Sequence, residues 1–311
     1  MAEQNEMINE VRKDLMGRYV VITKGRGARP HDPGHIAQKP QKTQPIEKCF
    51  FCPGNEHMTP PEIDRIERGG KWEIRVFPNK FPAFNAGSPK AYGRHEVIVE
   101  MPDHLATLSE LSEENLFDYL SMLVRRLSDA KKDSRLQYTS IFKNEGKSAG
   151  ASLEHSHTQL VGMPFVPPYV AKIAKKAKAF RKLASKKNLC WAENSDFVAI
   201  CPKTARFHYG TWIMPREPVN SIDSLPEAKL HSLASILKTV LSATDAAGEF
   251  PPYNIVFHNA PHAGGEFPFH VEILPRTSIW AGFELGTEVV MVSDVPEESV
   301  KLLRKFAKNK Q

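Results

Sequence analysis

The 311-residue sequence predicts an α+β protein made of two similar halves, each with an antiparallel sheet and flanking helices. Strand-like and helix-like segments alternate along the chain, and its length is sufficient for two domains. The segment YTSIFKN (138–144) also matches YNIVFHN (253–259) at an offset of 115 residues. We therefore expect two domains, 1–170 and 171–311.

Each half is expected to contain a strand, a helix, a strand, a phosphate-type loop and a further strand. The first helix is predicted over 112–131, where Ser112 is a good N-cap residue. The second is predicted over 226–246, where Pro226 suits the first helical position. A basic amphipathic helix over 172–187 would connect the two halves.

Charge and hydropathy limit the classes of function. The net charge of +6 and pI near 9.0 favour polyanionic partners such as nucleotides, sugar phosphates or nucleic acid. The basic helix has no interleaved aromatic residues, which disfavours nucleic acid and favours a solvated face. No apolar run approaches the roughly 20 residues of a membrane span, and residues 1–12 lack the apolar core of a secretory signal. We expect a cytoplasmic protein with no membrane partner.

The most informative motif is His-Ser-His-Thr-Gln at 155–159. On an extended strand, His155, His157 and Gln159 lie on one face. Neutral imidazole can attack phosphorus near pH 7 without first losing a proton, so His157 is the predicted nucleophile. The amide of Gln159 can hold a non-bridging oxygen but is no acid, which favours exchange among phosphate anions over hydrolysis.

A segment rich in small, amide and hydroxyl residues precedes this motif and suits phosphate oxygens. Its candidate contacts are Asn144, Gly150, Ala151 and Ser152. Further candidates are Arg26, in a cationic loop, and Asn79 with Lys80, which place an amide and an ammonium at the end of a strand.

A C-x-x-C motif, Cys49 and Cys52, predicts a metal site. It is followed by Pro-Gly-Asn, a turn typical of zinc knuckles rather than of redox motifs. Zinc accepts two thiolates and two imidazoles in tetrahedral geometry. The candidate imidazoles in the same half are His57, His95, His104 and His155. Such a zinc ion would be structural.

The second half lacks the complete histidine motif. At the offset of 115 residues, His155 falls on His270, His157 on Glu272 and Gln159 on Leu274. Chemistry is therefore expected in the first half. The residues His258, His262, His270 and Glu272 could bind a second metal or form a structural cluster of satisfied polar groups.

Together these residues resemble the galactose-1-phosphate uridylyltransferase family of the histidine-triad superfamily. The resemblance covers roughly residues 17–300. It includes segments 49–55, 77–81, 102–104, 144–152, 155–159, 270–276 and 281–286.

The resemblance implies a duplicated histidine-triad (HIT-like) fold, and a homodimer whose sites are completed across the interface. It implies ping-pong transfer through a nucleotidyl group on His157, with Gln159 at the phosphoryl oxygens. Zinc would be held by Cys49, Cys52, His104 and His155. Nucleotide contacts would map to Arg26, Asn79, Asn144, Gly150 and Ser152, and the neighbouring subunit would contribute Gly282 and Phe283.

The leading function implied is exchange of UMP between UDP-glucose and galactose 1-phosphate. An ADP-sugar or dinucleotide phosphorylase of the same superfamily is the alternative, and a zinc-stabilised nucleic-acid-binding protein a remote third.

Three departures from the family pattern matter. Ser156 replaces proline, as in relatives that handle adenylyl groups, and Ala151 replaces a cysteine. Lys172 and Ile173 occupy the region of a glutamate that binds a second metal in some members, so only one metal is expected.

Overall fold

The computed structural model describes residues 9–23 and 43–308, so the predicted contact Arg26 lies outside the described residues. The strands are β1 (Glu10–Lys13), β2 (Tyr19–Ile22), β3 (Asp64–Arg68), β4 (Lys71–Pro78), β5 (Arg94–Val99), β6 (Tyr138–Glu145), β7 (His157–Met163), β8 (Cys190–Glu193), β9 (Phe197–Ile200), β10 (Thr211–Pro215), β11 (Tyr253–His258), β12 (His270–Pro275) and β13 (Val290–Val292). The α-helices are α1 (Glu113–Ala130), α2 (Pro168–Lys175), α3 (Ala177–Ala184), α4 (Glu227–Gly248), α5 (Gly282–Thr287) and α6 (Pro296–Lys308).

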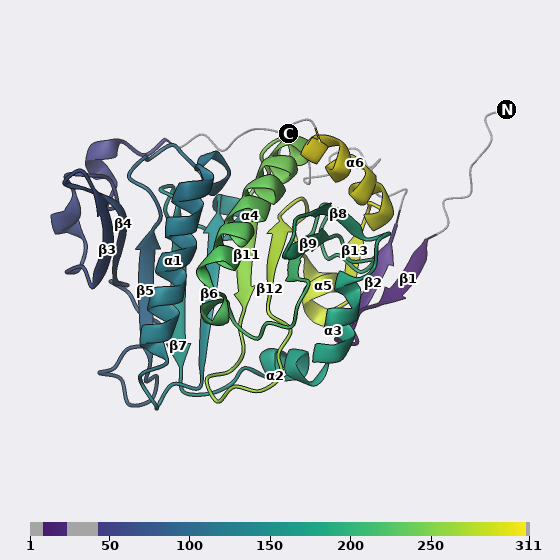
Figure 1. Cartoon of the computed structure of the whole chain (residues 1–311), viewed down its shortest axis with the longest axis horizontal. Coiled ribbons are helices and arrows are strands. Elements are labelled where there is room, and N and C mark those ends of the chain that lie inside the picture. The colour runs from purple at the N-terminus through teal and green to yellow at the C-terminus, as the bar shows by residue number, and fades with distance from the viewer. Residues whose placement is uncertain (1–8, 24–42, 309–311) are drawn as a thin grey trace.

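One antiparallel sheet of ten strands forms the centre of the molecule (Figure 1). Its order is β3-β4-β5-β7-β6-β11-β12-β10-β9-β8, and β6 and β11 pair at the middle. Outward from this pair, the strands on the two sides correspond one to one: β7 to β12, β5 to β10, β4 to β9 and β3 to β8. α1 lies between β5 and β6 in sequence, and α4 lies between β10 and β11. The chain is therefore a repeated α+β unit joined edge to edge into one sheet.

The repeat alignment at a constant offset of 115 residues is wrong within the strands. It equates Phe142 with Phe257, but Phe257 belongs to the core beneath the helices, whereas Phe142 packs on the opposite face. His157 and His270 are instead counterparts, because each is the first residue of its strand. Each also bonds from Nδ1 to the carbonyl two residues earlier, at 2.9 and 2.7 Å.

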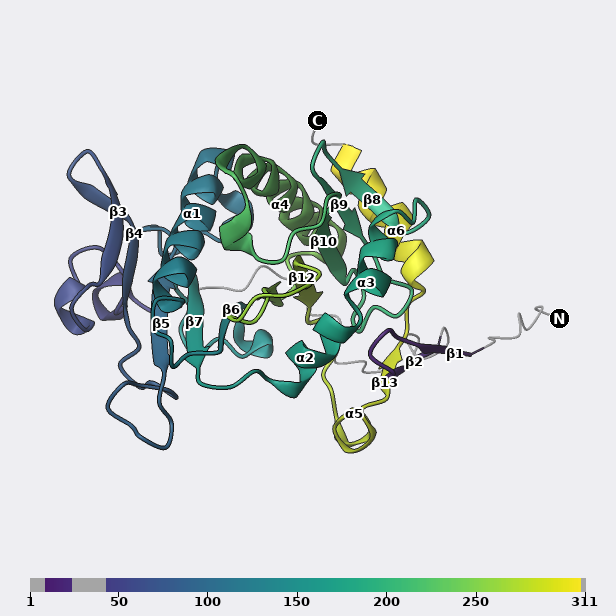
Figure 2. The ribbon, with the colours of Figure 1, turned by 60° about the horizontal axis from the view of Figure 1, so that its bottom comes forward.

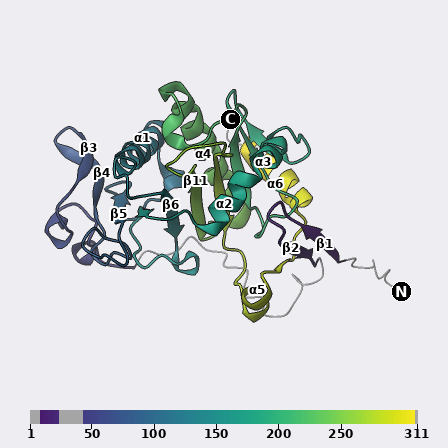
Figure 3. The ribbon, with the colours of Figure 1, turned by 90° about the horizontal axis from the view of Figure 1, so that it is seen from below.

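The two long helices cover one face of the sheet (Figure 3). α1 begins after Ser112, whose hydroxyl accepts from the Asn115 N–H at 3.1 Å, as the sequence predicted. α4 begins at Glu227, so Pro226 is the cap rather than the first helical residue. Leu120 and Leu237 belong to the shared apolar core between the helices and the sheet. This burial leaves the opposite face of the first half for polar chemistry.

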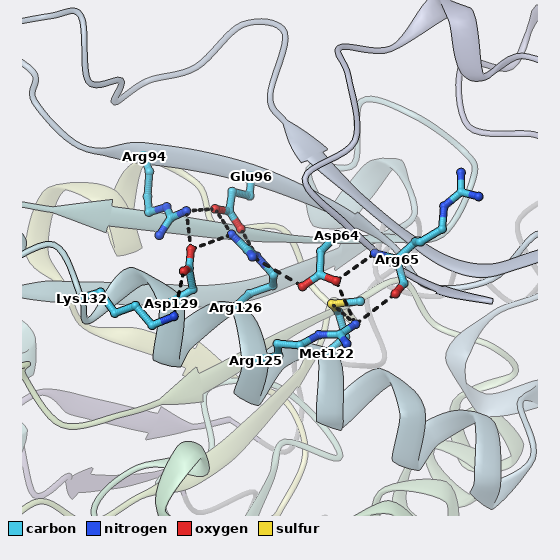
Figure 4. A network of polar contacts seen from close by, with 9 residues as sticks. All are labelled: Asp64, Arg65, Arg94, Glu96, Met122, Arg125, Arg126, Asp129 and Lys132. Carbon is cyan, nitrogen blue, oxygen red and sulfur yellow. Dashed lines mark hydrogen bonds and ion pairs between the residues drawn. The ribbon is translucent and has the colours of Figure 1, made fainter.

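A network of ion pairs attaches α1 to the sheet (Figure 4). The Arg126 guanidinium donates to both oxygens of Glu96 on β5, at 2.9 and 3.0 Å. It also contacts Asp64 on β3 at 3.5 Å and Asp129 at 3.1 Å. Two charged hydrogen bonds to one carboxylate fix both distance and orientation, so this network sets the position of α1 over β5.

The predicted connecting helix over 172–187 is two helices, α2 and α3. They are separated by Lys176, whose φ of −109° and ψ of 11° interrupt the helical path. Ile173 and Phe180 are buried against the face opposite α1 and α4, and the lysines lie outward. The predicted amphipathic pattern is therefore correct, but the prediction of one continuous helix is wrong.

A small sheet joins the two ends of the described chain. β2 pairs antiparallel with β1 and parallel with β13, while α6 packs against α4 and β8 (Figure 2). This pairing crosses the predicted boundary at 170/171, which stays a prediction. Within 9–23 and 43–308, no helix combines the length and apolar character needed to cross a membrane.

Candidate functional site

Four side chains of the first half converge into a buried metal-ligating cluster. They are Cys49, Cys52, His104 and His155, and their ligand atoms all lie within 4.8 Å of one another. The Cys49–Cys52 turn forms because Gly54 takes a φ of 91°, which a residue with a Cβ rarely adopts. Asn55 then donates its amide to the carbonyl of Cys49 at 2.8 Å and holds the turn closed.

The distances within this cluster suit a tetrahedral ion. Cys52 Sγ lies 3.3 Å from His104 Nδ1 and 3.5 Å from His155 Nδ1, and Cys49 Sγ lies 3.6 Å from His155 Nδ1. Metal bonds of about 2.0–2.3 Å in tetrahedral geometry would separate such atoms by about 3.3–3.8 Å. His57 and His95 were also candidate ligands, but neither belongs to the cluster.

The polar chemistry around the cluster also fits a bound cation. His155 donates Nε2–H to the carbonyl of Met101 at 2.9 Å, so its Nδ1 carries the lone pair that faces the thiols. Burial and the neighbouring Cys49 raise the pKa of Cys52 to about 12. A thiolate at this position therefore needs a cation to compensate its charge, and the cluster could hold a metal ion.

His157 starts β7 directly after the cluster and is only 6% exposed. Because a carbonyl oxygen can only accept, the 2.9 Å contact with His155 O requires a proton on His157 Nδ1. Nε2 therefore carries the lone pair. Burial and the charge of Lys143 lower the pKa of His157, which keeps the ring neutral near pH 7. These are the properties of a nucleophilic imidazole.

Gln159 lies on the same face of β7 and is oriented by His95 of β5, a residue that sequence reasoning considered only as a metal ligand. The Ala83 N–H donates to His95 Nδ1 at 3.2 Å, so the ring proton is on Nε2. That proton is donated to Gln159 Oε1 at 2.8 Å. The Gln159 amide nitrogen is then the group left to donate to a ligand.

A cavity of about 410 Å³ opens beside His157 and Gln159. Aromatic rings form much of its wall, and Phe51 lies edge-on to the His157 ring with centroids 5.3 Å apart. The residues that line it are Phe50, Phe51, Met58, Thr59, Pro60, Phe77, Asn79, Lys80, Phe81, Val97, Ser152, Leu153, His157 and Gln159. A cavity of this size and mixed character suits a small molecule with an aromatic ring and a polar end.

The other predicted contacts in this half lie in the strand and loop beside the cavity. Asn144, near the end of β6, accepts at Oδ1 from Asn254 at 2.8 Å. Gly150 and Ala151 donate their N–H groups within the loop, to Lys147 O at 3.0 Å and Gly146 O at 3.2 Å. The loop is compact, and the backbone amides of Gly150 and Ala151 are already engaged within it.

Gly282 and Phe283 are not among the residues that line this cavity. They begin α5, which projects from the body of the molecule on the side opposite α1 and α4 (Figures 2 and 3). Phe283 is 46% exposed and Leu285 is 72% exposed. Together with Ile279 they form an exposed apolar tip.

A buried ionic network behind β7 was missed from the sequence. Lys143 donates to Glu100 at 2.8 Å and to Ser156 Oγ at 2.7 Å, and it pairs with Glu145 at 3.0 Å. Burial acts to lower the pKa of Lys143, but the two carboxylates raise it above its usual value. Ser156 thus has a structural role that proline could not fill, because its hydroxyl donates to Glu100 at 2.7 Å. The sequence feature that could have indicated this network is the pair of charged residues, Lys143 and Glu145, within a strand that is otherwise suited to burial.

The second half carries a closed polar cluster at the position equivalent to the cavity. Glu272 accepts from Arg206 at 2.8 Å, Trp212 at 3.1 Å and His258 at 3.1 Å. Against the effect of burial, Arg206 and His258 hold the pKa of Glu272 well below its usual value. His270 stacks on His258 with ring centroids 4.3 Å apart. These contacts are those of a satisfied ionic cluster, and among the described residues only the Cys-Cys-His-His group meets the geometry of a metal site.

Comparisons with known proteins agree with this geometry. A family model described as a domain of unknown function (DUF4921) matches residues 92–308. An ADP-glucose phosphorylase of Arabidopsis thaliana is 30% identical over 96% of this chain and 93% of its own length. A galactose-1-phosphate uridylyltransferase of Thermotoga maritima is 27% identical over 93% of this chain and 96% of its own length.

Solved structures of the same two kinds of enzyme are also similar to this chain. The crystal structure of an ADP-glucose phosphorylase from Arabidopsis thaliana with bound ADP-glucose has a TM-score of 0.85 at 28% identity, covering 96% of this chain and 98% of that one. A uridylyltransferase structure has a TM-score of 0.76 at 25% identity, covering 97% of this chain and 99% of that one.

The fold and these relatives define an enzyme of the nucleotidyltransferase or phosphorylase class. The chain belongs to the galactose-1-phosphate uridylyltransferase family, of which the Arabidopsis ADP-glucose phosphorylase is also a member. The family and the fold class predicted from the sequence are both confirmed.

Proposed function

We propose that this protein transfers a nucleotidyl group from a nucleotide sugar to a phosphate-bearing acceptor through a covalent intermediate on His157. The observation that carries the proposal is the arrangement of His157 and Gln159 on one cavity wall. His157 has its proton fixed on Nδ1 and its lone pair on Nε2. Gln159 has its oxygen occupied by His95 and its amide N–H groups available.

The first step makes one bond and breaks one. The His157 Nε2 lone pair attacks the α-phosphorus of the nucleotide sugar, and the bond from that phosphorus to the bridging oxygen breaks. The leaving group departs as a sugar 1-phosphate anion and needs no proton. This agrees with Gln159 at the site, because an amide can hold an oxygen but cannot act as the general acid that a poorer leaving group would need. Gln159 donates to a non-bridging oxygen, where negative charge grows.

The second step reverses the first with a different phosphate. An acceptor phosphate oxygen attacks the nucleotidyl-His157, and Nε2 leaves with its lone pair restored. Asn79, Lys80 and Ser152 line the cavity, and we propose them as substrate contacts together with Asn144, Gly150, Ala151 and Arg26.

We assign zinc to the cluster of Cys49, Cys52, His104 and His155. When bound, the ion would supply charge compensation and a fixed cross-link between the 49–52 turn and the start of β7. Two sulfur and two nitrogen ligands leave no open coordination position, so its role is structural. The reacting groups are those of the protein chain.

Two nucleotide assignments follow from different relatives. Adenylyl transfer from an ADP-sugar to inorganic phosphate is supported by the likeness to ADP-glucose phosphorylase, with 30% identity and a TM-score of 0.85. Ser156 in place of proline supports it too. UMP exchange between UDP-glucose and galactose 1-phosphate, the leading interpretation from the sequence, is supported by the uridylyltransferases at 27% identity and below. We rank the adenylyl reaction first.

The active unit we propose is a homodimer. The exposed apolar tip of α5, with Phe283 and Leu285, would pack against the neighbouring subunit and bring Gly282 and Phe283 to its substrate. Sedimentation of the wild type and of Phe283→Asp tests this: a dimer that becomes an inactive monomer supports it, and a wild-type monomer with full activity contradicts it.

The function itself is tested by product analysis with two substrate pairs. ADP-glucose with inorganic phosphate should give ADP and glucose 1-phosphate. UDP-glucose with galactose 1-phosphate should give UDP-galactose and glucose 1-phosphate. The pair with the larger kcat/KM identifies the nucleotide, and His157→Asn should abolish turnover with both. A protein that forms product from neither pair would contradict the proposal.

A further inference from the structure

Arg276, which directly follows β12, connects the second half to the face of the sheet that carries His157. Its Nη1 donates to Asn254 Oδ1 at 3.2 Å. Asn254 lies on β11 between Tyr253 and Ile255, which both point into the core beneath the helices. Because side chains alternate along a strand, Asn254 points to the opposite face, the face of Gln159.

A chain of amides links this arginine to the loop after β6. Asn254 pairs directly with Asn144 across the centre of the sheet, and its Nδ2 donates to Asn144 Oδ1 at 2.8 Å. The same nitrogen donates to the carbonyl of Ala149 at 2.8 Å. Both side-chain groups of Asn254 are thereby fixed, and Arg276 is held against the segment that precedes the catalytic strand.

The guanidinium of Arg276 has more hydrogen-bond donors than partners. Among the described residues no carboxylate pairs with it, and its Nε is buried without a hydrogen-bond partner. Its other neighbours are the ring of Phe207, 5.0 Å away, and a second cation, Arg206. Burial and Arg206 both lower its pKa.

Two other arginines that are shielded from solvent are neutralised by carboxylates. Arg206 pairs with Glu272 at 2.8 Å, and Arg126 pairs with Glu96 at 2.9 Å. An arginine kept half-buried beside another cation, without an acid, is suited to an anion supplied by a ligand.

We propose that Arg276, positioned by Asn254, forms an anion subsite for the phosphate group that leaves with the sugar and for the acceptor phosphate that replaces it. This inference rests on the proposed function and deepens it, because it makes the second half part of the site. Both β6 and β11 lie between β7 and β12, so about 14 Å separates the strand that His157 begins from the strand that Arg276 follows. Side chains reaching inward from His157 and Arg276 can span that distance across a diphosphate.

The test uses inorganic phosphate as the probe and the full chain as the protein. Calorimetric titration of the wild type, of Arg276→Gln and of the surface control Arg135→Gln gives phosphate affinity without any catalysis. Arg276→Gln should weaken binding by about 10- to 100-fold, the worth of one charged hydrogen-bonded contact. Arg135→Gln removes an equally cationic but exposed side chain and should bind as the wild type does.

A kinetic readout separates this role from a structural one. Arg276→Gln should raise the KM of the acceptor phosphate by a similar factor while the affinity for AMP or UMP stays within about twofold of the wild type. If the glutamine variant unfolds, Arg276→Lys keeps the charge without the planar fork, and it should show a smaller loss of phosphate affinity at unchanged thermal stability.

The outcomes distinguish the subsite from the proposed function. Unchanged phosphate affinity in Arg276→Gln, equal loss in both variants, or no phosphate binding by the wild type would overturn the subsite. Phosphate binding that depends on Arg276 in a protein that transfers no nucleotidyl group would uphold the subsite and refute the transfer reaction. Normal transfer with an unchanged acceptor KM in Arg276→Gln would refute the subsite alone.

Discussion

His157 donates its Nδ1–H to the backbone carbonyl of His155, 2.9 Å away, so the proposed nucleophile is oriented by the residue that faces the metal cluster. His155 is in turn fixed at the other edge of its ring, where Nε2–H donates to the carbonyl of Met101 at 2.9 Å. The cluster and the nucleophile therefore share one short segment that these two hydrogen bonds hold in place. Anything that loosens the cluster should also misplace His157.

Loss of the metal should lower both stability and activity. Cys52→Ser removes a ligand that contacts both histidines, so bound zinc should fall from about one per chain to a small fraction, and Tm should drop by several degrees. Elemental analysis measures the bound zinc, and thermal unfolding measures Tm. Cys201→Ser, at a buried cysteine outside the cluster, should keep its zinc. Equal zinc content in both variants would contradict the assignment.

The contact between His95 and Gln159 should affect the rate more than substrate binding. His95→Ala frees the Gln159 amide to rotate, so its N–H groups face the phosphoryl oxygen only part of the time, and kcat should fall by about tenfold or more. KM for the nucleotide sugar should change little. His57→Ala, an exposed histidine of the same half, provides the control. Equal kcat values for the two variants would show that His95 does not orient Gln159.

Breaking the network behind β7 should strongly destabilise the fold. Lys143→Met leaves the carboxylates of Glu100 and Glu145 buried without their cation, which typically costs about 3–5 kcal/mol of unfolding free energy. Denaturant unfolding measures this cost. Lys147→Met, at an exposed position in the next loop, should stay within about 0.5 kcal/mol of the wild type. A similarly small effect for Lys143→Met would contradict the role of the network.

Stability should fall as the solution is acidified through the range in which an unfolded histidine gains its proton. Burial, with a smaller effect from His258, lowers the pKa of His270 to about 3, against about 6.5 in the unfolded chain. Between these values the unfolded state binds a proton that the folded state does not, so His270 costs up to about 1.4 kcal/mol per pH unit as pH falls below 6.5. Above pH 6.5 it contributes no pH dependence.

His270→Phe should flatten this dependence between pH 6.5 and pH 4, measured as unfolding free energy in urea at each pH. The exposed His57→Phe should leave the slope unchanged. A steeper or identical slope for His270→Phe would mean that the buried ring is not the group that takes up the proton.

The candidate site could be predicted from the sequence because its key residues lie close together along the chain. His157 and Gln159 are two residues apart, and Cys49 and Cys52 three apart, so their relation follows from the period of a strand and the span of a turn. Assigning His104 and His155 as the remaining ligands depended on family resemblance, since spacing alone left four histidines open. The structure brings those two, and not His57 or His95, to the thiols.

Other features depend on pairing between distant strands and could not be read from the sequence. His95 meets Gln159 only because β5 pairs with β7, and Lys143 meets Glu100 through contacts across three strands. The repeat was recognised, but a constant offset misassigned its members. The counterpart of His157 is His270 and not Glu272, because each of the two histidines begins its strand and bonds from Nδ1 to the carbonyl two residues earlier.

The central claim is most directly tested by trapping the intermediate. The wild-type chain is incubated with ADP-glucose or UDP-glucose labelled at the α-phosphorus, denatured, digested and mapped by mass spectrometry. The account predicts one acid-labile nucleotidyl group per active chain, on His157, lost in His157→Asn and retained in His270→Asn, its counterpart in the second half. Label on another residue, or sugar nucleotide turnover with no label and with His157→Asn fully active, would contradict it.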